Sequence, residues 1–327
     1  MRADALCRPC HGYGLLLLRA IGQLEGVSKV EKLIIHAGSQ KTGTTSIQSF
    51  LHESRTALQG IGFTYAETCF GDPNITSHYN SIRGFFSKSP EEMDHTAKFV
   101  EKVNSSSGTV IISAESLFSF PAKHIFEDNT GYWIRKKMML EEIRSAFQTR
   151  DFEIIFFLRD KQRFLVSLFR QYLRVVQRPS PTLAAALDAF LNSEGHLENY
   201  ETQIRIWREV FGNVTIVDYD DAARMGGSSI EAFCNAAGIK GIPITDRREN
   251  ASPDWASLEE RRLLQFFGAK ANPGIFKDAR RELLNLEIEK EVNARIAAHL
   301  NDPEPYFSEF TPYEWRSAKG DVEEVVN

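Results

Sequence analysis

The residues Leu33-Ile-Ile-His-Ala37 run directly into Gly38-Ser-Gln-Lys-Thr-Gly-Thr-Thr-Ser46, and this junction decides the fold. The first five residues are almost continuously apolar, which predicts a strand covered on both faces, as in a buried parallel sheet. Thr45–Leu58 then carries apolar side chains at helical spacing, which predicts an amphipathic helix. A strand, a glycine-containing loop and a helix direct several main-chain N–H groups and a helix dipole at one point. The junction therefore predicts a loop that binds an anion.

The loop residues themselves have the chemistry of an anion site. Gly38 and Gly43 permit backbone angles and close approaches that a side chain would obstruct. Lys41 adds a mobile positive charge, and Thr44 and Thr45 add hydroxyl donors at the start of the helix. The simpler interpretation is a turn rich in glycine and threonine that only caps the helix.

The loop differs from the nucleotide-binding Walker A motif, G-x-x-x-x-G-K-[ST], in the place of its lysine. Gly38 and Gly43 have the spacing of the two glycines, but the lysine precedes the second glycine, and Thr44 stands where the motif has lysine. This departure indicates a phosphate loop that does not grip the β- and γ-phosphates of a nucleoside triphosphate. A P-loop kinase or NTPase stays as an alternative, which would need Mg²⁺ and a second carboxylate, with Asp218 as the candidate.

A second candidate anion site follows a later apolar run, Glu153–Leu158. Arg159 comes directly after this run, at the carboxyl end of a predicted strand, where open α/β sheets place their ligands. Asp160 is suited to cap the next helix, which carries Ser167 about two turns later. An arginine fork and a hydroxyl group would then face a second anion. A surface salt bridge is the simpler role for Arg159.

The rest of the chain repeats this alternation of apolar runs and helical segments. Further strands are predicted at Thr109–Ser113 and Val214–Tyr219, with a short edge strand within Gly60–Tyr65. The pattern predicts one α/β domain, doubly wound, with a mainly parallel sheet of about four to five strands, a P-loop-like first βα unit and helical elaborations. The predicted later helices are Gln162–Val176, two helices within Leu183–Phe211 that join near Gly195, and Leu258–Leu300 with a break at Pro273-Gly274.

The domain is expected to span residues 32–310, with the helical elaborations over 180–212 and 255–300. Residues 1–31 show no clear strand or helix period, so we expect a poorly ordered N-terminal tail. Residues 311–327 are expected to form a C-terminal tail.

The composition excludes several classes of protein. The 327 residues are 42% hydrophobic and 25% charged, and the formal net charge of −5 argues against general nucleic-acid binding. Four scattered cysteines do not make a disulfide framework, so we expect a reducing compartment. No apolar run approaches the roughly 18 residues of a membrane span. The motif Cys7-Arg-Pro-Cys10-His11 matches covalent haem attachment, but no export signal accompanies it, and we interpret it as a chance match.

The segment IIHAGSQKTGTTSIQ, residues 34–48, resembles the phosphosulfate-binding loop of sulfotransferases that use 3′-phosphoadenosine-5′-phosphosulfate (PAPS). The segment IIFFLRDKQRFLVSLFRQ, residues 154–171, resembles their second signature, an arginine that ends a strand and a serine about eight residues later. The resemblance covers roughly residues 32–270 and is closest to bacterial members that act on carbohydrates or glycolipids. It implies a P-loop fold and transfer of the sulfuryl group of PAPS to a hydroxyl or amine of such an acceptor.

The resemblance also implies a role for each motif. Lys41 would donate to the bridging oxygen as 3′,5′-bisphosphoadenosine leaves, Arg159 and Ser167 would hold the 3′-phosphate, and no metal is implied. Many members close a late Arg/Lys-Gly loop over the nucleotide; that loop is not found here, and Arg247 and Arg248 are the candidates to replace it. The loop residues implied to bind the nucleotide are Gly38, Ser39, Gln40, Lys41, Thr42, Gly43, Thr44 and Thr45.

The acceptor group needs a base, and the sequence offers two candidates. Glu115 follows the strand Thr109–Ser113, so its carboxylate is expected at the same sheet edge as the loop. His78 is expected to reach in from a loop after the edge strand. The alternatives are that neither residue is the base, or that Glu115 only caps the helix after it. His36 lies within the first strand and is expected to be a hydrogen-bonded histidine beneath the loop.

The implied partners are PAPS and a small carbohydrate or glycolipid acceptor, with no nucleic acid and no membrane span. We expect a cytoplasmic protein, with peripheral membrane association if the acceptor is a lipid. Arg170, Arg174 and Arg178 have helical spacing, which indicates either a solvated face or a preference for an anionic acceptor. A non-catalytic protein that only binds a nucleotide is the alternative from another class. The sequence does not indicate an oligomeric state.

Overall fold

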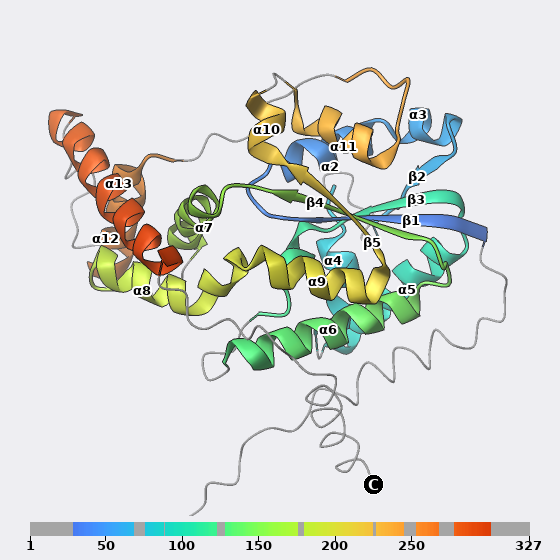
Figure 1. Cartoon of the computed structure of the whole chain (residues 1–327), viewed down its shortest axis with the longest axis horizontal. Coiled ribbons are helices and arrows are strands. Elements are labelled where there is room, and N and C mark those ends of the chain that lie inside the picture. Colours follow the sequence, from blue (N-terminus) through green and yellow to red (C-terminus); the bar gives the residue numbers. More distant parts are fainter. Residues whose placement is uncertain are drawn as a thin grey trace, which may run out of the picture.

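A computed structural model describes residues 29–68, 76–87, 89–122, 128–175, 180–224, 227–244, 253–267 and 278–301. These residues contain a five-stranded sheet with helices on both faces (Figure 1). The strand order is β2-β3-β1-β4-β5, and every neighbouring pair is parallel. The predicted doubly wound α/β fold is therefore confirmed. The strands are β1 (Lys29–Gly38), β2 (Phe63–Tyr65), β3 (Ser107–Ser113), β4 (Phe152–Leu158) and β5 (Asn213–Asp218).

The central strands are apolar throughout because each is covered on both faces. In β1, Ile35 packs into one core and Ile34 into the other, and in β4 Phe156 and Phe157 divide in the same way. Successive side chains of a strand point to opposite faces, so a strand between two helix layers needs an apolar residue at nearly every position.

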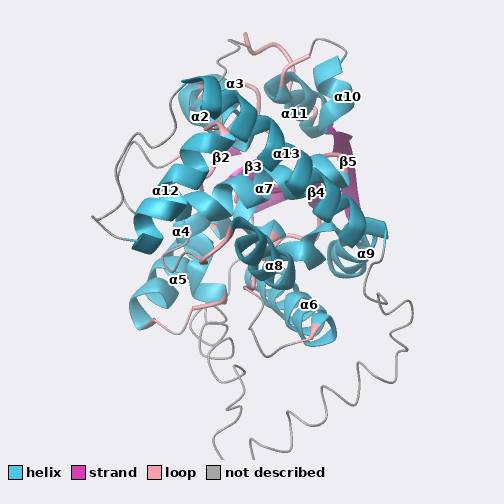
Figure 2. Ribbon diagram, turned by 90° about the vertical axis from the view of Figure 1, so that its left-hand side faces the viewer, coloured by secondary structure: helices cyan, strands magenta, loops and turns pink. Residues whose placement is uncertain are grey.

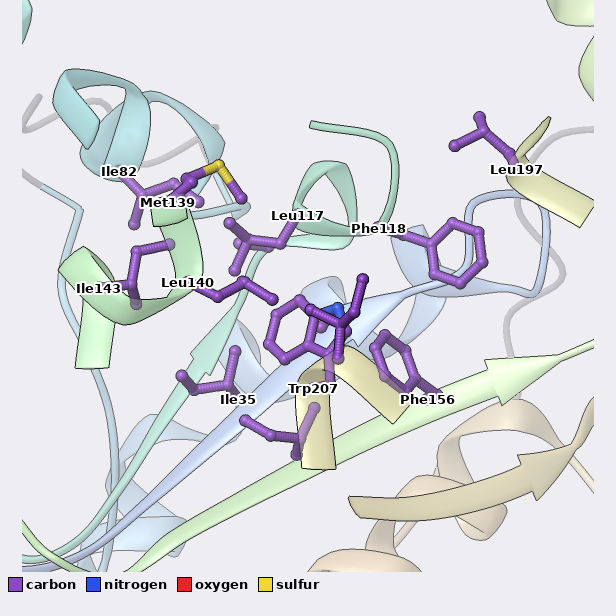
Figure 3. Close-up of a cluster of buried hydrophobic side chains, with 14 of the residues drawn as sticks. Ile35, Ile82, Leu117, Phe118, Met139, Leu140, Ile143, Phe156, Leu197 and Trp207 are labelled. Atoms are coloured by element: carbon purple, nitrogen blue, oxygen red, sulfur yellow. The ribbon is translucent and has the colours of Figure 1, made fainter. Parts of the chain in front are cut away.

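Each core is completed by the helices of one layer. Figure 3 shows the larger core around Trp207, which lies among Ile35, Phe156 and Leu140 and is fully buried. The ring of Trp207 meets that of Phe156 edge to face, with 5.2 Å between the centroids. One layer contains α5 (Pro90–Asn104), α6 (Asn129–Ala146) and α9 (Tyr200–Phe211), and the other contains α2 (Thr44–Glu53), α3 (Arg55–Gly60) and α11 (Ser229–Ala237).

A further group of helices lies beyond the carboxyl ends of the strands, and Figure 2 views the molecule from that side. This group contains α7 (Lys161–Val175), α8 (Leu183–Glu194), α12 (Trp255–Phe267) and α13 (Asp278–Asn301). Helices α8, α12 and α13 lie within the segments where helical elaborations are expected. The short elements are α4 (Tyr79–Ile82), α10 (Tyr219–Arg224) and the 3₁₀ helices η1 (Arg83–Phe85), η2 (Glu115–Phe118) and η3 (Gly195–Glu198).

The structure differs from the sequence prediction at several boundaries, two of which lie in the first βα unit. The helix predicted at Thr45–Leu58 is divided into α2 and α3 at Ser54, whose N–H still donates to Phe50 O at 2.9 Å. Strand β1 begins at Lys29, within the segment assigned to the N-terminal tail, because Lys29 pairs with Ser107 of β3.

Within the described residues, no helix has both the length and the apolar character that crossing a lipid bilayer requires. Several features singled out from the sequence lie outside the described residues. They are residues 1–28 of the N-terminal tail, the end of the predicted domain (302–310), the C-terminal tail (311–327), the Cys7, Cys10 and His11 motif, the break at Pro273-Gly274, and Arg178, Arg247 and Arg248.

Candidate active site

The two glycines of the loop after β1 are required by close contacts. Gly38 has a φ of 109°, and a Cβ on it would lie 2.9 Å from Glu115 O and 3.1 Å from Phe118 Cβ. Gly43 has a φ of 75°, and a Cβ there would lie 2.6 Å from Ser229 Oγ. Any side chain at either position would displace the loop from the elements that pack on it.

Three polar side chains of the loop hold it in place. The N–H and the hydroxyl of Ser39 both donate to Phe157 O, each at 2.9 Å. Thr42 Oγ1 donates to Ser39 O at 2.6 Å, and Gln40 Nε2 donates to Ser119 Oγ at 2.8 Å. These side chains therefore fix the shape of the loop and leave its main chain and Lys41 to meet a ligand.

The main-chain N–H groups of the loop are available to an anion. Within the described residues, those of Gln40, Lys41, Thr42 and Gly43 donate to no carbonyl or side chain. Gly43 is the N-cap of α2 and offers no side chain to that helix end. Lys41 has a left-handed φ of 68°, a component of the N–H concavities that bind anions. The loop thus combines unpaired donors with the positive end of a helix dipole.

Arg159 lies at the same sheet edge as the loop, because β4 pairs directly with β1. Gly38 stands opposite Phe156 in the register, and Ser39 bonds to Phe157, two residues before the arginine. The ring of Tyr219 lies between the two motifs. It is 3.6 Å from the position of a Cβ on Gly43, and its centroid is 5.8 Å from the guanidinium carbon of Arg159.

Asp220 is an unpredicted partner of Arg159. Its Oδ1 lies 3.6 Å from Arg159 Nε and 3.3 Å from Arg163 Nη1, and its Oδ2 accepts from the N–H of Asp160 at 3.0 Å. Asp160 accepts from Arg163 N–H at 3.0 Å and so caps α7, as the sequence predicts. The side chain of Arg159 is 24% exposed, which leaves room for a second anion beside Asp220.

Ser167 lies in α7, half-buried, and within the described part of the chain its hydroxyl makes no hydrogen bond. Arg170 and Arg174 follow it by three and seven residues, on the same face of the helix. The sequence left open whether these arginines face solvent or a ligand. Both arginines act on the charges of the site. Burial lowers the pKa of Arg170, Glu289 opposes this, and Arg159 lowers the pKa further. Arg174 lowers the pKa of Lys41, after the larger effect of burial.

Glu115 is the first residue of η2, directly beyond the end of β3, and its carboxylate accepts from the hydroxyl of Thr44. Burial raises the pKa of Glu115 to about 7, and the nearby ammonium of Lys41 acts in the opposite direction. The pKa of Lys41 is lowered by burial and then by Arg174, which Glu115 opposes. The expected closeness of Glu115 to the loop is thus present in the structure.

His78 is placed differently from Glu115. It is fully buried, Nε2 donates to Ala66 O at 2.8 Å, and Nδ1 accepts from Ser113 N–H at 3.0 Å. Burial lowers the pKa of His78 to about 4. Both ring nitrogens are therefore committed to main-chain atoms and tie this segment to β3. His36 has the expected place beneath the loop, with Nδ1 2.8 Å from Ser113 Oγ.

A buried lysine that was not predicted from the sequence holds the turn that carries Glu115. Lys136 of α6 is fully buried, and its Nζ donates to the carbonyls of Leu117, Phe118 (3.0 Å) and Phe120 (2.5 Å). Gln203 Nε2 also donates to Phe118 O, at 2.8 Å. Burial lowers the pKa of Lys136 well below its ordinary value. The carboxyl end of η2 is thus fixed by two donors from different helices.

Metal ligands do not gather in the part of the chain that the structure covers: no three His, Cys, Asp or Glu side chains there form a group that could hold an ion.

Comparison with known proteins found no matching family model and no matching curated protein. Among solved structures, the chain is similar to a sulfotransferase from Alicyclobacillus acidocaldarius, with 16% sequence identity and a TM-score of 0.39. The match covers 77% of this chain and 95% of the other.

Glu115→Gln is expected to change the pH dependence of stability. Burial raises the folded-state pKa from 4.5 to about 7, so the folded protein binds this proton more tightly than the unfolded chain. The protonated carboxyl group of Glu115 therefore contributes to the free energy of unfolding. This contribution is fully present below the pKa of the unfolded chain and is lost as the pH rises through about 7. Across that window, the free energy of unfolding of the wild type relative to the variant should fall by an amount on the order of 3 kcal/mol. Urea denaturation at fixed pH steps measures it.

Glu101→Gln is the control for this experiment, because Glu101 is an exposed carboxylate on α5. Its stability profile should run parallel to that of the wild type. A constant difference between wild type and Glu115→Gln from pH 5 to pH 8 would contradict the placement of Glu115.

Lys136→Met should destabilise the protein by about 1–3 kcal/mol, the range for buried acceptors left without a donor. The neighbouring variant Lys137→Met is the matched control, since Lys137 forms an ion pair with Glu209 at 2.9 Å in which Glu209 is 43% exposed. Such a pair contributes about 0–1 kcal/mol. Chemical denaturation of both variants makes the comparison, and equal losses would show that Lys136 does not hold the turn.

Proposed function

We propose that this protein is a sulfotransferase that moves the sulfuryl group of PAPS to a hydroxyl or amine of a carbohydrate or glycolipid acceptor. One observation carries the proposal: the lysine-bearing loop and Arg159 lie at one sheet edge, linked through the bonds from Ser39 to Phe157. PAPS has two anionic ends, the 5′-phosphosulfate and the 3′-phosphate, and it needs two anion sites within reach of one molecule. The resemblance of both sequence motifs to those of PAPS-dependent sulfotransferases supports the same assignment.

The loop acts on the phosphosulfate end. The unpaired N–H groups of residues 40–43 and the first turn of α2 hold the 5′-phosphate. Lys41 donates to the oxygen between phosphorus and sulfur, where negative charge grows as the S–O bond breaks. Burial and Arg174 lower the pKa of Lys41, which makes its ammonium a stronger donor to that oxygen.

Arg159 and Ser167 act on the 3′-phosphate. The guanidinium of Arg159 is positioned by Asp220 and is partly exposed, and the hydroxyl of Ser167 is not used within the described structure. An arginine fork and a hydroxyl match the acceptor oxygens of a phosphate, and they favour a nucleotide with a 3′-phosphate over ATP. These fixed cations supply the positive charge, so the proposal requires no metal.

Glu115 is assigned as the base in preference to His78. A carboxyl group with a pKa of about 7 exchanges protons readily at neutral pH, and Thr44 orients it beside Lys41. It accepts the proton of the acceptor as the acceptor oxygen or nitrogen bonds to sulfur. The bond from sulfur to the bridging oxygen breaks, and 3′,5′-bisphosphoadenosine leaves with the electron pair. His78 has no ring nitrogen left for this task.

The position of Asp218 favours sulfuryl transfer over a kinase or NTPase. This residue ends β5, the edge strand, which is separated from β1 by β4. Its Oδ1 accepts from Asp221 N–H at 2.8 Å and so caps α10. The carboxylate that a kinase would need for Mg²⁺ is therefore engaged elsewhere, two strands away from the loop.

Lys41→Ala should lower turnover by about 10²–10³-fold, the effect of removing one preorganised donor to a developing charge. The measurement is the release of 3′,5′-bisphosphoadenosine from PAPS in the presence of a panel of carbohydrate and lipid acceptors. Lys32→Ala, at the other end of β1 where Lys32 pairs with Glu153 at 3.4 Å, should retain wild-type turnover. Wild-type turnover in a folded Lys41→Ala protein would remove the assignment of Lys41.

Arg159→Ala should weaken the binding of 3′,5′-bisphosphoadenosine by about 1.5–3 kcal/mol, the range for hydrogen bonds to charged groups. Titration calorimetry without Mg²⁺ measures it, and Arg208→Ala, an exposed site on α9, serves as the control. A loss below about 0.5 kcal/mol counts against the 3′-phosphate site. Tighter binding of ATP with Mg²⁺ than of the bisphosphate would favour the kinase alternative.

A further inference from the structure

The polar face of α7 carries more positive charge than the proposed nucleotide site uses. Ser167, Arg170 and Arg174 share this face. Figure 1 shows α7 beyond the carboxyl ends of the strands, in the same region as the loop after β1. Ser167 and Arg174 are separated by about 10 Å along the helix axis, so a single phosphate group does not occupy both.

Arg174, on the exposed part of the same face of α7, is close enough to Lys41 to act on its charge. Among the neighbouring charges that lower the pKa of Lys41, Arg174 has a larger effect than Arg159. Its side chain is exposed, and no carboxylate of the described residues pairs with it. Arg174 therefore adds an uncompensated positive charge beside the reacting end of the site.

Arg170 supports Arg174 from one turn earlier on the helix. Its guanidinium carbon lies 4.4 Å from the ring centroid of Trp255, which fixes the side chain. Its Nε is buried and has no hydrogen-bond partner among the described residues. Burial lowers the pKa of Arg170, Glu289 and Asp254 oppose the shift, and Arg159 adds to it. The contact with Trp255 thus holds Arg170 in place one turn before Arg174.

We propose that the acceptor carries an anionic group, either a carboxylate or a sulfate or phosphate ester, that Arg174 binds with the help of Arg170. The inference rests on the proposed function, in which the nucleotide takes Lys41 and the loop at one end and Arg159 with Ser167 at the other. Arg174 is then not taken by the nucleotide, and its effect on Lys41 puts it near the phosphosulfate end, where the acceptor must bind for transfer. Planar guanidinium groups bind such oxygen pairs through two parallel hydrogen bonds, which positions the acceptor as well as attracting it.

The test measures binding to protein saturated with 3′,5′-bisphosphoadenosine, using two matched pairs of probes. The first pair is a hyaluronan oligosaccharide and its carboxyl-reduced, neutral form. The second is vesicles of phosphatidylglycerol and of phosphatidylcholine, which distinguishes a lipid source of the anion from a carbohydrate one. Wild type should bind the anionic member of one pair at least 10-fold more tightly. Arg174→Gln should lose that preference, and the exposed control Arg208→Gln should keep it.

Several outcomes overturn the proposal. If wild type binds the anionic and the neutral probe of each pair equally, or binds none of them, the site does not select an anion. If Arg174→Gln keeps the preference for the anionic probe, this arginine does not bind the anion. Weaker binding of the bisphosphate by Arg174→Gln would assign Arg174 to the nucleotide. A wild type that does not bind the bisphosphate refutes the proposed function itself, so the two failures are distinguishable.

Discussion

The parallel pairing of β1 with β4 is the constraint on which the site depends. Neighbouring strands lie about 4.8 Å apart, and the register places Gly38 opposite Phe156. The bond from the Ser39 hydroxyl to Phe157 O then joins the start of the loop to a residue 118 positions later in the chain. Because both chain segments leave the sheet at the same edge, the loop and Arg159 cannot separate without breaking the central strand pair. The pairing of β1 with β4 therefore also brings the loop and Arg159 together.

A second set of contacts places Glu115 against the loop. Gly38 approaches Glu115 O so closely that only a residue without a side chain fits there. At the other end of η2, Lys136 donates hydrogen bonds to main-chain carbonyls. Burying a lysine has a desolvation cost, which the hydrogen bonds to three carbonyls offset. The turn is held from both ends, so Glu115 meets the loop in one arrangement, as a preorganised site requires.

The sequence predicted those features that follow from local patterns. The apolar runs located the strands, and the loop after β1 and the capping role of Asp160 follow from residue types at fixed spacing. Features that depend on tertiary packing could not be predicted from the sequence. Lys136 has the same local appearance in the sequence as its half-buried neighbour Lys137, and only the packing of α6 over η2 distinguishes them. Likewise, the spacing of Arg170 and Arg174 is that of any charged helix face until α7 is placed at the sheet edge.

The charges around Glu115 bear on the role proposed for it as the base. Glu115 has a pKa of about 7 because it is buried, and an anionic nucleotide bound nearby would raise that pKa further. A protonated Glu115 accepts no proton. Lys41 already opposes the effect of burial on Glu115, and Arg159 and Arg174 lie close enough to Lys41 to lower its pKa. Lys41 counters this effect of the nucleotide, because its ammonium lowers the pKa of Glu115. In the proposed function, this local cluster of cations, in a chain of net charge −5, serves both the binding of anions and the transfer of a proton.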